Sequence, residues 1–180
     1  MSSSWTPRVA AVAAAVALAL PFGAAQALTA GPSNFNVTAT VANFCTVSAA
    51  NVPFGSVNAG AAATNTSSSV TLTCNKGANV TSVALNSGSN FAAGSKQMKN
   101  GANSDTLAYN IDVPTGATFN TCPTAGTGPE WNATNTIVAT SLFTATGGAK
   151  LINICASIPA NQFPSAGSYS DTVQVTETYN

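Results

Sequence analysis

Residues 107–113 read LAYNIDV, and apolar side chains occupy every second position of this stretch. Successive side chains of a β-strand point to opposite faces of a sheet, so the apolar residues of 107–113 share one face. Alternation with a period of two is typical of a half-buried strand and not of a helix. The stretch therefore predicts a strand whose apolar face is formed by Leu107, Tyr109, Ile111 and Val113.

Similar stretches recur along the chain and are separated by segments rich in Gly, Asn and Ser. Regularly spaced strands with turns between them indicate a β-sandwich and not alternating strands and helices. Two stretches do not fit: residues 114–135 predict a long surface excursion, and the Ala-, Thr-, Asn- and Ser-rich residues 59–68 predict a flexible loop. The further strands are predicted at residues 35–41, 69–74, 80–86, 137–143, 151–158 and 169–179.

The composition excludes several classes of protein. Of 180 residues only 6% are charged, against about 25% in an average protein, and the formal net charge is zero. A nucleic-acid-binding protein needs a basic surface, which this chain lacks. There is no histidine, which excludes histidine-dependent catalytic triads and histidine-containing zinc sites. The neutral, hydroxyl- and amide-rich surface repels its own copies poorly, which favours self-association.

The N-terminal residues 1–27 have the pattern of a secretory signal peptide. Arg8 precedes an apolar run of Ala, Val and Leu over residues 9–20, and Ala25-Gln26-Ala27 provides a cleavage site. The run is shorter than the roughly 20 residues of a membrane-spanning helix, which disfavours a retained membrane anchor. We expect cleavage after Ala27 and export of the chain.

Four cysteines follow this segment, an even number that favours two disulfides in an oxidising compartment. No pair has the short C-x-x-C spacing of a zinc or redox site. Of three connectivities we favour Cys45–Cys74 and Cys122–Cys155, because each closes a loop of moderate length between predicted strands. A loop of about 30 residues restrains the unfolded chain by roughly 3 to 4 kcal/mol.

Catalytic and ligand-binding interpretations find little support in the carboxylates. A glycosidase would need its acid and base among five widely separated residues, namely Asp105, Asp112, Glu130, Asp171 and Glu177. We expect Asp171 and Glu177, which could share a strand face, to be edge or solvent-facing charges that discourage wrong pairing. A Ca²⁺ site at Asp105 and Asp112 lacks the usual loop spacing. Trp131 could stack on a sugar, but a lone Trp is more often a core or cover residue.

The chain resembles the spore coat protein U domain family, which includes the Csu-type pilins of archaic chaperone-usher pili. The resemblance covers nearly all of the chain after residue 27, and its most specific part is the C-terminal Gly-x-Tyr-x-Asp-Thr-Val pattern. The matching stretches are Cys45-Thr46-Val47, Phe54-Gly55, Leu72-Thr73-Cys74, Leu107-Ala108-Tyr109, Ile158-Pro159 and residues 166–176, AGSYSDTVQVT.

This resemblance implies an all-β, immunoglobulin-like sandwich that lacks its last strand and is completed by donor-strand complementation. An unpaired edge with an exposed apolar core is an aggregation hazard, so such a domain needs a strand from another chain. In the family a periplasmic chaperone supplies it first, and the N-terminal extension of the next subunit replaces it at an outer-membrane usher. The implied role is a non-enzymatic, cofactor-free subunit of a surface fibre that supports adhesion and biofilm formation. The alternative is a secreted spore-coat or carbohydrate-binding protein that does not polymerise.

The C-terminal strand is the segment that the chaperone is expected to pair with. Gly167 is fourteenth from the end and Tyr179 is penultimate, a spacing that also resembles chaperone-usher pilins in general. The resemblance implies that the chaperone binds the terminal carboxylate of Asn180. The residues assigned to this strand are Gly167, Tyr169, Val173, Val175, Tyr179 and Asn180.

The N-terminal arm, residues 28–41, is the expected donor segment, and residues 42–180 are the expected pilin domain. Strand addition requires alternation, because main-chain bonds supply the pairing and every second side chain enters a pocket. Residues 35–41 alternate in this way, and we expect them to enter a neighbouring subunit. The same residues could instead form the first strand of their own sandwich. The donor side chains would be Phe35, Val37, Ala39 and Val41.

Overall fold

The computed structural model describes residues 28–180, and the expected signal peptide lies outside this range. The chain divides between Ala39 and Thr40 into two units. Residues 28–44 form no strand, and the strands begin at Cys45. In residues 28–180 no helix is present that would suffice, by length and hydropathy, to span a bilayer.

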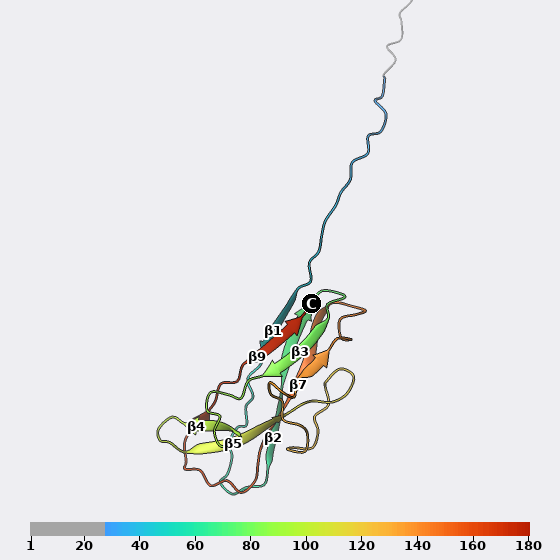
Figure 1. Cartoon of the computed structure of the whole chain (residues 1–180). Coiled ribbons are helices and arrows are strands. Elements are labelled where there is room, and N and C mark those ends of the chain that lie inside the picture. The colour runs from blue at the N-terminus through green and yellow to red at the C-terminus, as the bar shows by residue number, and fades with distance from the viewer. Residues whose placement is uncertain (1–27) are drawn as a thin grey trace, which may run out of the picture. The chain divides into compact units, whose positions relative to one another are not determined.

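Within the described residues, nine antiparallel strands form two sheets, as expected for an all-β sandwich (Figure 1). The larger sheet has the order β1-β2-β7-β5-β4-β8, and the smaller sheet has the order β6-β3-β9. The strands are β1 (Cys45–Ala49), β2 (Thr64–Cys74), β3 (Val80–Leu85), β4 (Lys96–Asn100), β5 (Thr106–Asp112), β6 (Ile137–Ala139), β7 (Gly148–Ile158), β8 (Tyr169–Ser170) and β9 (Val175–Tyr179).

The core lies between the inward faces of the two sheets. Strands β2 and β7 pair along their full length, from Thr64 opposite Ile158 to Cys74 opposite Gly148, and their alternate apolar side chains are buried. The predicted face of β5 is buried at Leu107, Tyr109 and Ile111. The period-two alternation thus placed the central strands correctly, because every second side chain is withdrawn from water.

Three predictions about the loops and strand lengths were wrong. Of the strand predicted at residues 137–143 only Ile137–Ala139 forms β6, and residues 140–143 are a turn. Residues 64–68, expected in a flexible loop, form the first half of β2. Their side chains are polar, but their backbone pairs with β7 at every residue. The segment 169–179 is not one strand but two, β8 on the larger sheet and β9 on the smaller one. Strand β4 was not predicted at all.

The excursion of residues 114–135 contains no strand apart from isolated bridges, as predicted, yet it contributes to the core. Trp131 is fully buried, and its Nε1 donates a hydrogen bond to the carbonyl oxygen of Val83 at 2.9 Å. Its indole therefore closes the sandwich beside β3. This confirms the interpretation of Trp131 as a core residue and leaves no exposed ring for stacking on a sugar.

Candidate functional site: an open groove between β1 and β9

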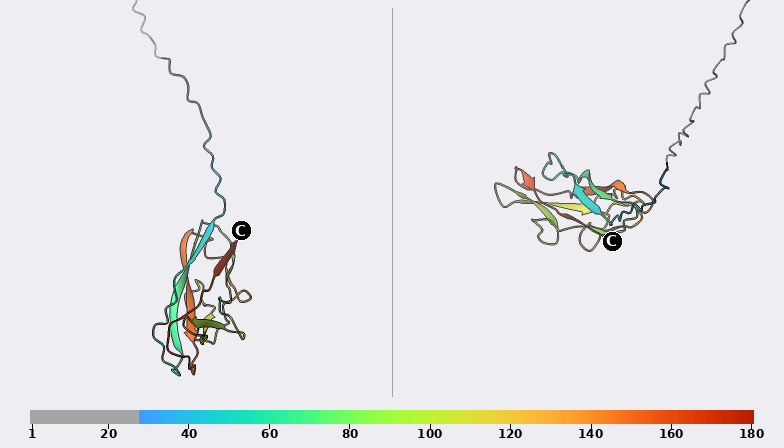
Figure 2. Two further views of the ribbon diagram at one scale, coloured as in Figure 1. Left: turned by 90° about the vertical axis from the view of Figure 1, so that its left-hand side faces the viewer. Right: turned by 90° about the horizontal axis from the view of Figure 1, so that it is seen from above.

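Within residues 28–180 the larger sheet has the edge strands β1 and β8, the smaller sheet has β6 and β9, and the candidate site lies at the edges formed by β1 and β9. Strand β1 pairs only with β2, and β9 pairs only with β3. The two edges lie side by side, one in each sheet, and run in opposite directions (Figure 1; left view of Figure 2). Because an open edge presents unpaired N–H and C=O groups, the space between β1 and β9 can accept an added strand.

A cleft of about 670 Å³ lies beside the segment that follows β1 and the segment that leads into β8. One wall is residues 52–62, which follow β1, and the other includes residues 164–169, which lead into β8. Its floor is apolar and includes Met98, Leu107 and Ile158. We call the combined space the groove, flanked by residues 45–62 on one side and 164–179 on the other.

Half-buried apolar side chains follow both flanks of the groove. Val47, Val52, Phe54 and Val57 pack against the core from the first flank, and Tyr169, Val173 and Val175 pack against it from the second. Half-buried side chains at an open edge gain free energy when a further segment covers them. An extended segment with alternating apolar side chains fits this geometry.

Gln162, which the sequence analysis did not single out, holds one wall of the cleft in place. Its Oε1 accepts a hydrogen bond from the Ala108 N–H at 2.7 Å, and its Nε2 donates to the Ala108 carbonyl at 2.9 Å. Strand β5 pairs with β7 only at residues 110–112, so Gln162 replaces the missing partner of β5 at Ala108. The Gln162 side-chain amide bonds to Ala108 as the backbone of a neighbouring strand would. Hydrophobic periodicity in the sequence does not predict such a contact.

The second flank keeps its alternation through the break between β8 and β9. The odd-numbered residues from Tyr169 to Glu177 are half-buried, whereas the even-numbered ones are exposed. Asp171 and Glu177 thus belong to the inward row and are not solvent-facing, although Glu177 lies on the edge strand β9, as the other half of the prediction states. Gly167 precedes β8, where a Cβ atom would collide with the Asn100 side chain, and the backbone of Asn180 pairs with Asn79 after β9.

Asp171 explains why the chain changes sheets at this point. Its Oδ2 accepts a hydrogen bond from the Tyr109 hydroxyl at 2.6 Å, and its Oδ1 accepts two from Asn90, from N and Nδ2, each at 3.0 Å. These bonds fix the backbone between β8 and β9 onto the core. Burial of the phenol, together with the hydrogen bond to Asp171, raises the pKa of Tyr109 far above its ordinary value.

Glu177 places a carboxylate across the gap between the two open edges. An oxygen of its carboxylate lies within 4.8 Å of the Sγ atoms of Cys45 and Cys74. Both sulfurs belong to a disulfide and are not thiolate ligands for a metal. The Oε2 atom is buried and has no hydrogen-bond partner within the described chain, and burial raises the pKa of the carboxyl.

The four predicted donor side chains lie in the segment without strands. Phe35 is 84% exposed, Val37 is 85% exposed and Val41 is 80% exposed, and Ala39 is exposed as well. Residues 35–41 are assigned to no strand. Large exposed apolar side chains in such a row are unusual for a protein surface.

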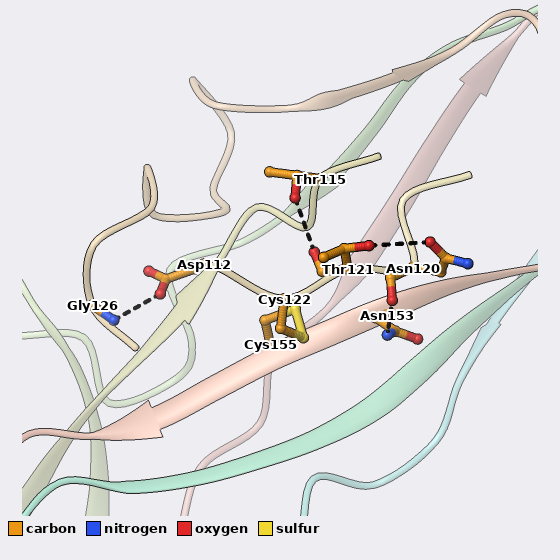
Figure 3. The surroundings of a disulfide bond; sticks show 8 residues. All are labelled: Asp112, Thr115, Asn120, Thr121, Cys122, Gly126, Asn153 and Cys155. Carbon is orange, nitrogen blue, oxygen red and sulfur yellow. Dashed lines mark hydrogen bonds between the residues drawn. A yellow bond between two sulfur atoms is a disulfide. The ribbon is translucent and has the colours of Figure 1, made fainter. Parts of the chain in front are cut away.

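Both predicted disulfides are present, Cys45–Cys74 between β1 and β2 and Cys122–Cys155 between the excursion and β7. Figure 3 shows the second one beside Asp112, whose Oδ2 accepts a hydrogen bond from the Gly126 N–H at 2.8 Å. Burial raises the pKa of Asp112, and the hydrogen bond from Gly126 opposes this shift. The disulfide and Asp112 therefore tie the excursion to the outer face of the larger sheet.

The calcium site considered at Asp105 and Asp112 is not formed, because the two residues lie at opposite ends of β5. Asp105 and Asp112 flank the length of β5, a separation of about 20 Å at 3.3 Å per residue. Glu130 lies 3.4 Å from the Nζ of Lys96, a fully buried lysine that also donates to the Asn86 carbonyl at 2.8 Å. This pair fastens the excursion to β4.

The family model for the Spore Coat Protein U domain matches residues 32–176, most of the chain. The chain belongs to the Spore Coat Protein U domain family. The match includes the predicted donor side chains, strands β1 to β8 and the first two residues of β9. Among curated proteins no sequence matches the chain significantly.

Two solved structures are similar to this Spore Coat Protein U domain, and the first of them shares its fold. One is a chain of the CsuC–CsuE chaperone–tip adhesion subunit pre-assembly complex from the archaic chaperone-usher Csu pili of Acinetobacter baumannii, with 22% identity and a TM-score of 0.52. The similarity covers 77% of this chain and 40% of that chain. Another belongs to a chaperone–tip adhesin complex of CFA/I fimbriae, with 14% identity, a TM-score of 0.37 and coverage of 76% and 42%.

Proposed function

We propose that this Spore Coat Protein U domain is a structural, non-enzymatic subunit of a cell-surface pilus assembled by donor-strand exchange. The observation that carries the proposal is the pairing of an open groove with an exposed, alternating apolar arm in one chain. The groove can accept a further strand, and the arm has the alternation of a strand but forms none in its own chain. Each satisfies the other when the arm of one copy enters the groove of the next.

The arm is poorly placed to fill the groove of its own domain. Three residues, 42–44, separate Val41 from the first residue of β1, and they span at most about 14 Å. A strand parallel to β1 needs a connection of about a dozen residues, so the own arm could reach the groove only as a hairpin antiparallel to β1. Insertion parallel to β1, and therefore antiparallel to β9, requires a second copy.

The groove would be unstable as an exposed surface before assembly, so a chaperone is part of the proposal. The chaperone complex with a TM-score of 0.52 supports a chaperone as partner, and the proposal is that this chaperone covers β9 as far as Asn180. An outer-membrane usher would then exchange the chaperone for the next arm. The route requires export, which residues 1–27 would direct, and places the polymer at the cell surface, where it supports adhesion and biofilm formation.

Deletion of residues 28–41, with the signal retained, tests the proposal. We expect the variant to accumulate in the periplasm as a chaperone-bound monomer, while the wild type gives a ladder of polymers that survives unheated detergent. A ladder from the deletion variant would refute donation by the arm. Loss of the monomer as well would show that the arm is the first strand of its own sandwich. A wild type that purifies alone, as one monomeric band, would favour a coat or carbohydrate-binding protein.

A further inference from the structure

The buried Oε2 of Glu177 is a polar atom without a partner at the place where a donor strand would cover it. The side chain comes from the inward row of β9 and reaches toward the Cys45–Cys74 disulfide on β1. A strand that entered between β1 and β9 would bury this carboxylate further. Because an unpaired buried carboxylate is strongly unfavourable, the incoming segment should bring a hydrogen-bond donor to this position.

The arm contains no charged residue between Leu28 and Phe44, so it cannot offer an ion pair. On the face that carries Phe35, Val37, Ala39 and Val41, the next inward positions are Ser33 at one end and Asn43 at the other. A hydroxyl or an amide is therefore the only donor that an inward side chain of the arm can bring next to the apolar row.

The side chains of the second flank select one alignment. When the arm runs antiparallel to β9 with Phe35 opposite Val175, Val37 lies opposite Val173 and the small Ala39 lies opposite Asp171, whose carboxylate is already engaged by Tyr109 and Asn90. Ser33 then lies opposite Glu177. A shift of the arm by two residues in either direction places Phe35 or Gly31 opposite Glu177, and neither residue has a side chain that donates a hydrogen bond.

We propose that the Ser33 hydroxyl of an incoming arm donates a hydrogen bond to Glu177 of the preceding subunit and so fixes the register of the donor strand. This inference rests on the proposed function and specifies which residue determines the alignment. In a strand with a repeat of two, the apolar side chains alone also fit when shifted by two residues. Ser33 and Glu177 provide the single polar match that distinguishes the correct register.

Cysteine pairing tests the register in full-length polymers. The double variant Phe35→Cys with Val175→Cys should form a disulfide between subunits on mild oxidation, visible as a covalent ladder in heated, non-reducing gels. Val41→Cys with Val175→Cys, which reports the opposite strand direction, should give at most a tenth of that yield. The single-cysteine variants are the controls for random oxidation. A higher yield from the pair Val41→Cys and Val175→Cys would overturn the proposal, because Asn43 and not Ser33 would then lie opposite Glu177.

The hydrogen bond is tested by the rate at which polymers dissociate in detergent. Ser33→Ala should accelerate dissociation about tenfold or more, as expected for a lost bond to a charged acceptor, and Ser33→Thr should restore the slow rate. Asn34→Ala, on the outward face, should leave the rate unchanged. In a Glu177→Ala background, Ser33→Ala should have no further effect. A tenfold effect that persists in this background would refute the contact. Polymers that form without the arm would instead refute donor-strand exchange itself.

Discussion

The substitution Val37→Asp, compared with Thr38→Asp, tests whether one face of the arm enters the groove. Val37 is 85% exposed in the structure, so its full burial in a neighbouring groove contributes about 1.5 to 3 kcal/mol. An aspartate at this position loses that contribution and adds the cost of an unpaired buried charge, several kcal/mol more. A total of about 5 kcal/mol lowers the association constant by three to four orders of magnitude. Thr38→Asp adds the same charge to the outward face and should cost less than about 0.5 kcal/mol.

The assay is the ladder of unheated polymers in detergent, measured at equal amounts of exported protein. We expect Val37→Asp to yield only monomer and chaperone-bound subunit, and Thr38→Asp to yield a ladder like that of the wild type. Neither residue belongs to a strand of the sandwich, so both variants should leave the domain folded. Equal polymerisation by the two variants, or equal loss, would contradict a face-specific donor strand.

Three further predictions concern the framework that holds the groove. Asp171→Ala should lower the free energy of unfolding by about 3 kcal/mol, and a double-mutant cycle with Tyr109→Phe should be non-additive, because both changes remove the same 2.6 Å hydrogen bond. Burial raises the pKa of Asp112 above 3.8, so between these two pH values the folded state retains a proton that the unfolded chain loses. The free energy of unfolding should therefore fall as pH rises from about 3.8 through the raised pKa. The variant Asp112→Asn should reduce the difference between the melting temperatures at pH 4 and pH 7. Replacement of Cys122 and Cys155 by Ala should cost roughly 3 to 4 kcal/mol, a fall in the melting midpoint of about 10 °C, because the bond closes a loop with a sequence separation of 33; an unchanged midpoint would contradict this assignment.

The alternation of apolar side chains predicted the strands that have one face in the core. At residues 107–113 the period-two pattern was sufficient, because burial acts on every second side chain wherever a sheet covers a core. The disulfide pairs followed from the same strands. The resemblance to the Spore Coat Protein U domain came from short motifs, and the match over residues 32–176 confirms it.

The features that the sequence did not reveal depend on tertiary contacts. Strand β4 begins with Lys96, whose burial is compensated by Asn86 and Glu130, partners far apart in sequence. The polar half of β2 is a strand because β7 pairs with it, and not because of its own composition. The break between β8 and β9 arises from Asp171, which bonds to Tyr109 across the core. No local pattern encodes any of these contacts.

The absence of charge from the arm has a consequence for the environments in which such a fibre survives. Dissolved salt weakens attraction between opposite charges, with a screening length of about 10 Å at 0.1 M and about 3 Å at 1 M. An uncharged insert has no such attraction to lose, and salts such as sulfate favour the withdrawal of apolar groups from water. Contacts between subunits that are made by the neutral arm of residues 28–41 should therefore keep their strength from fresh water to brine.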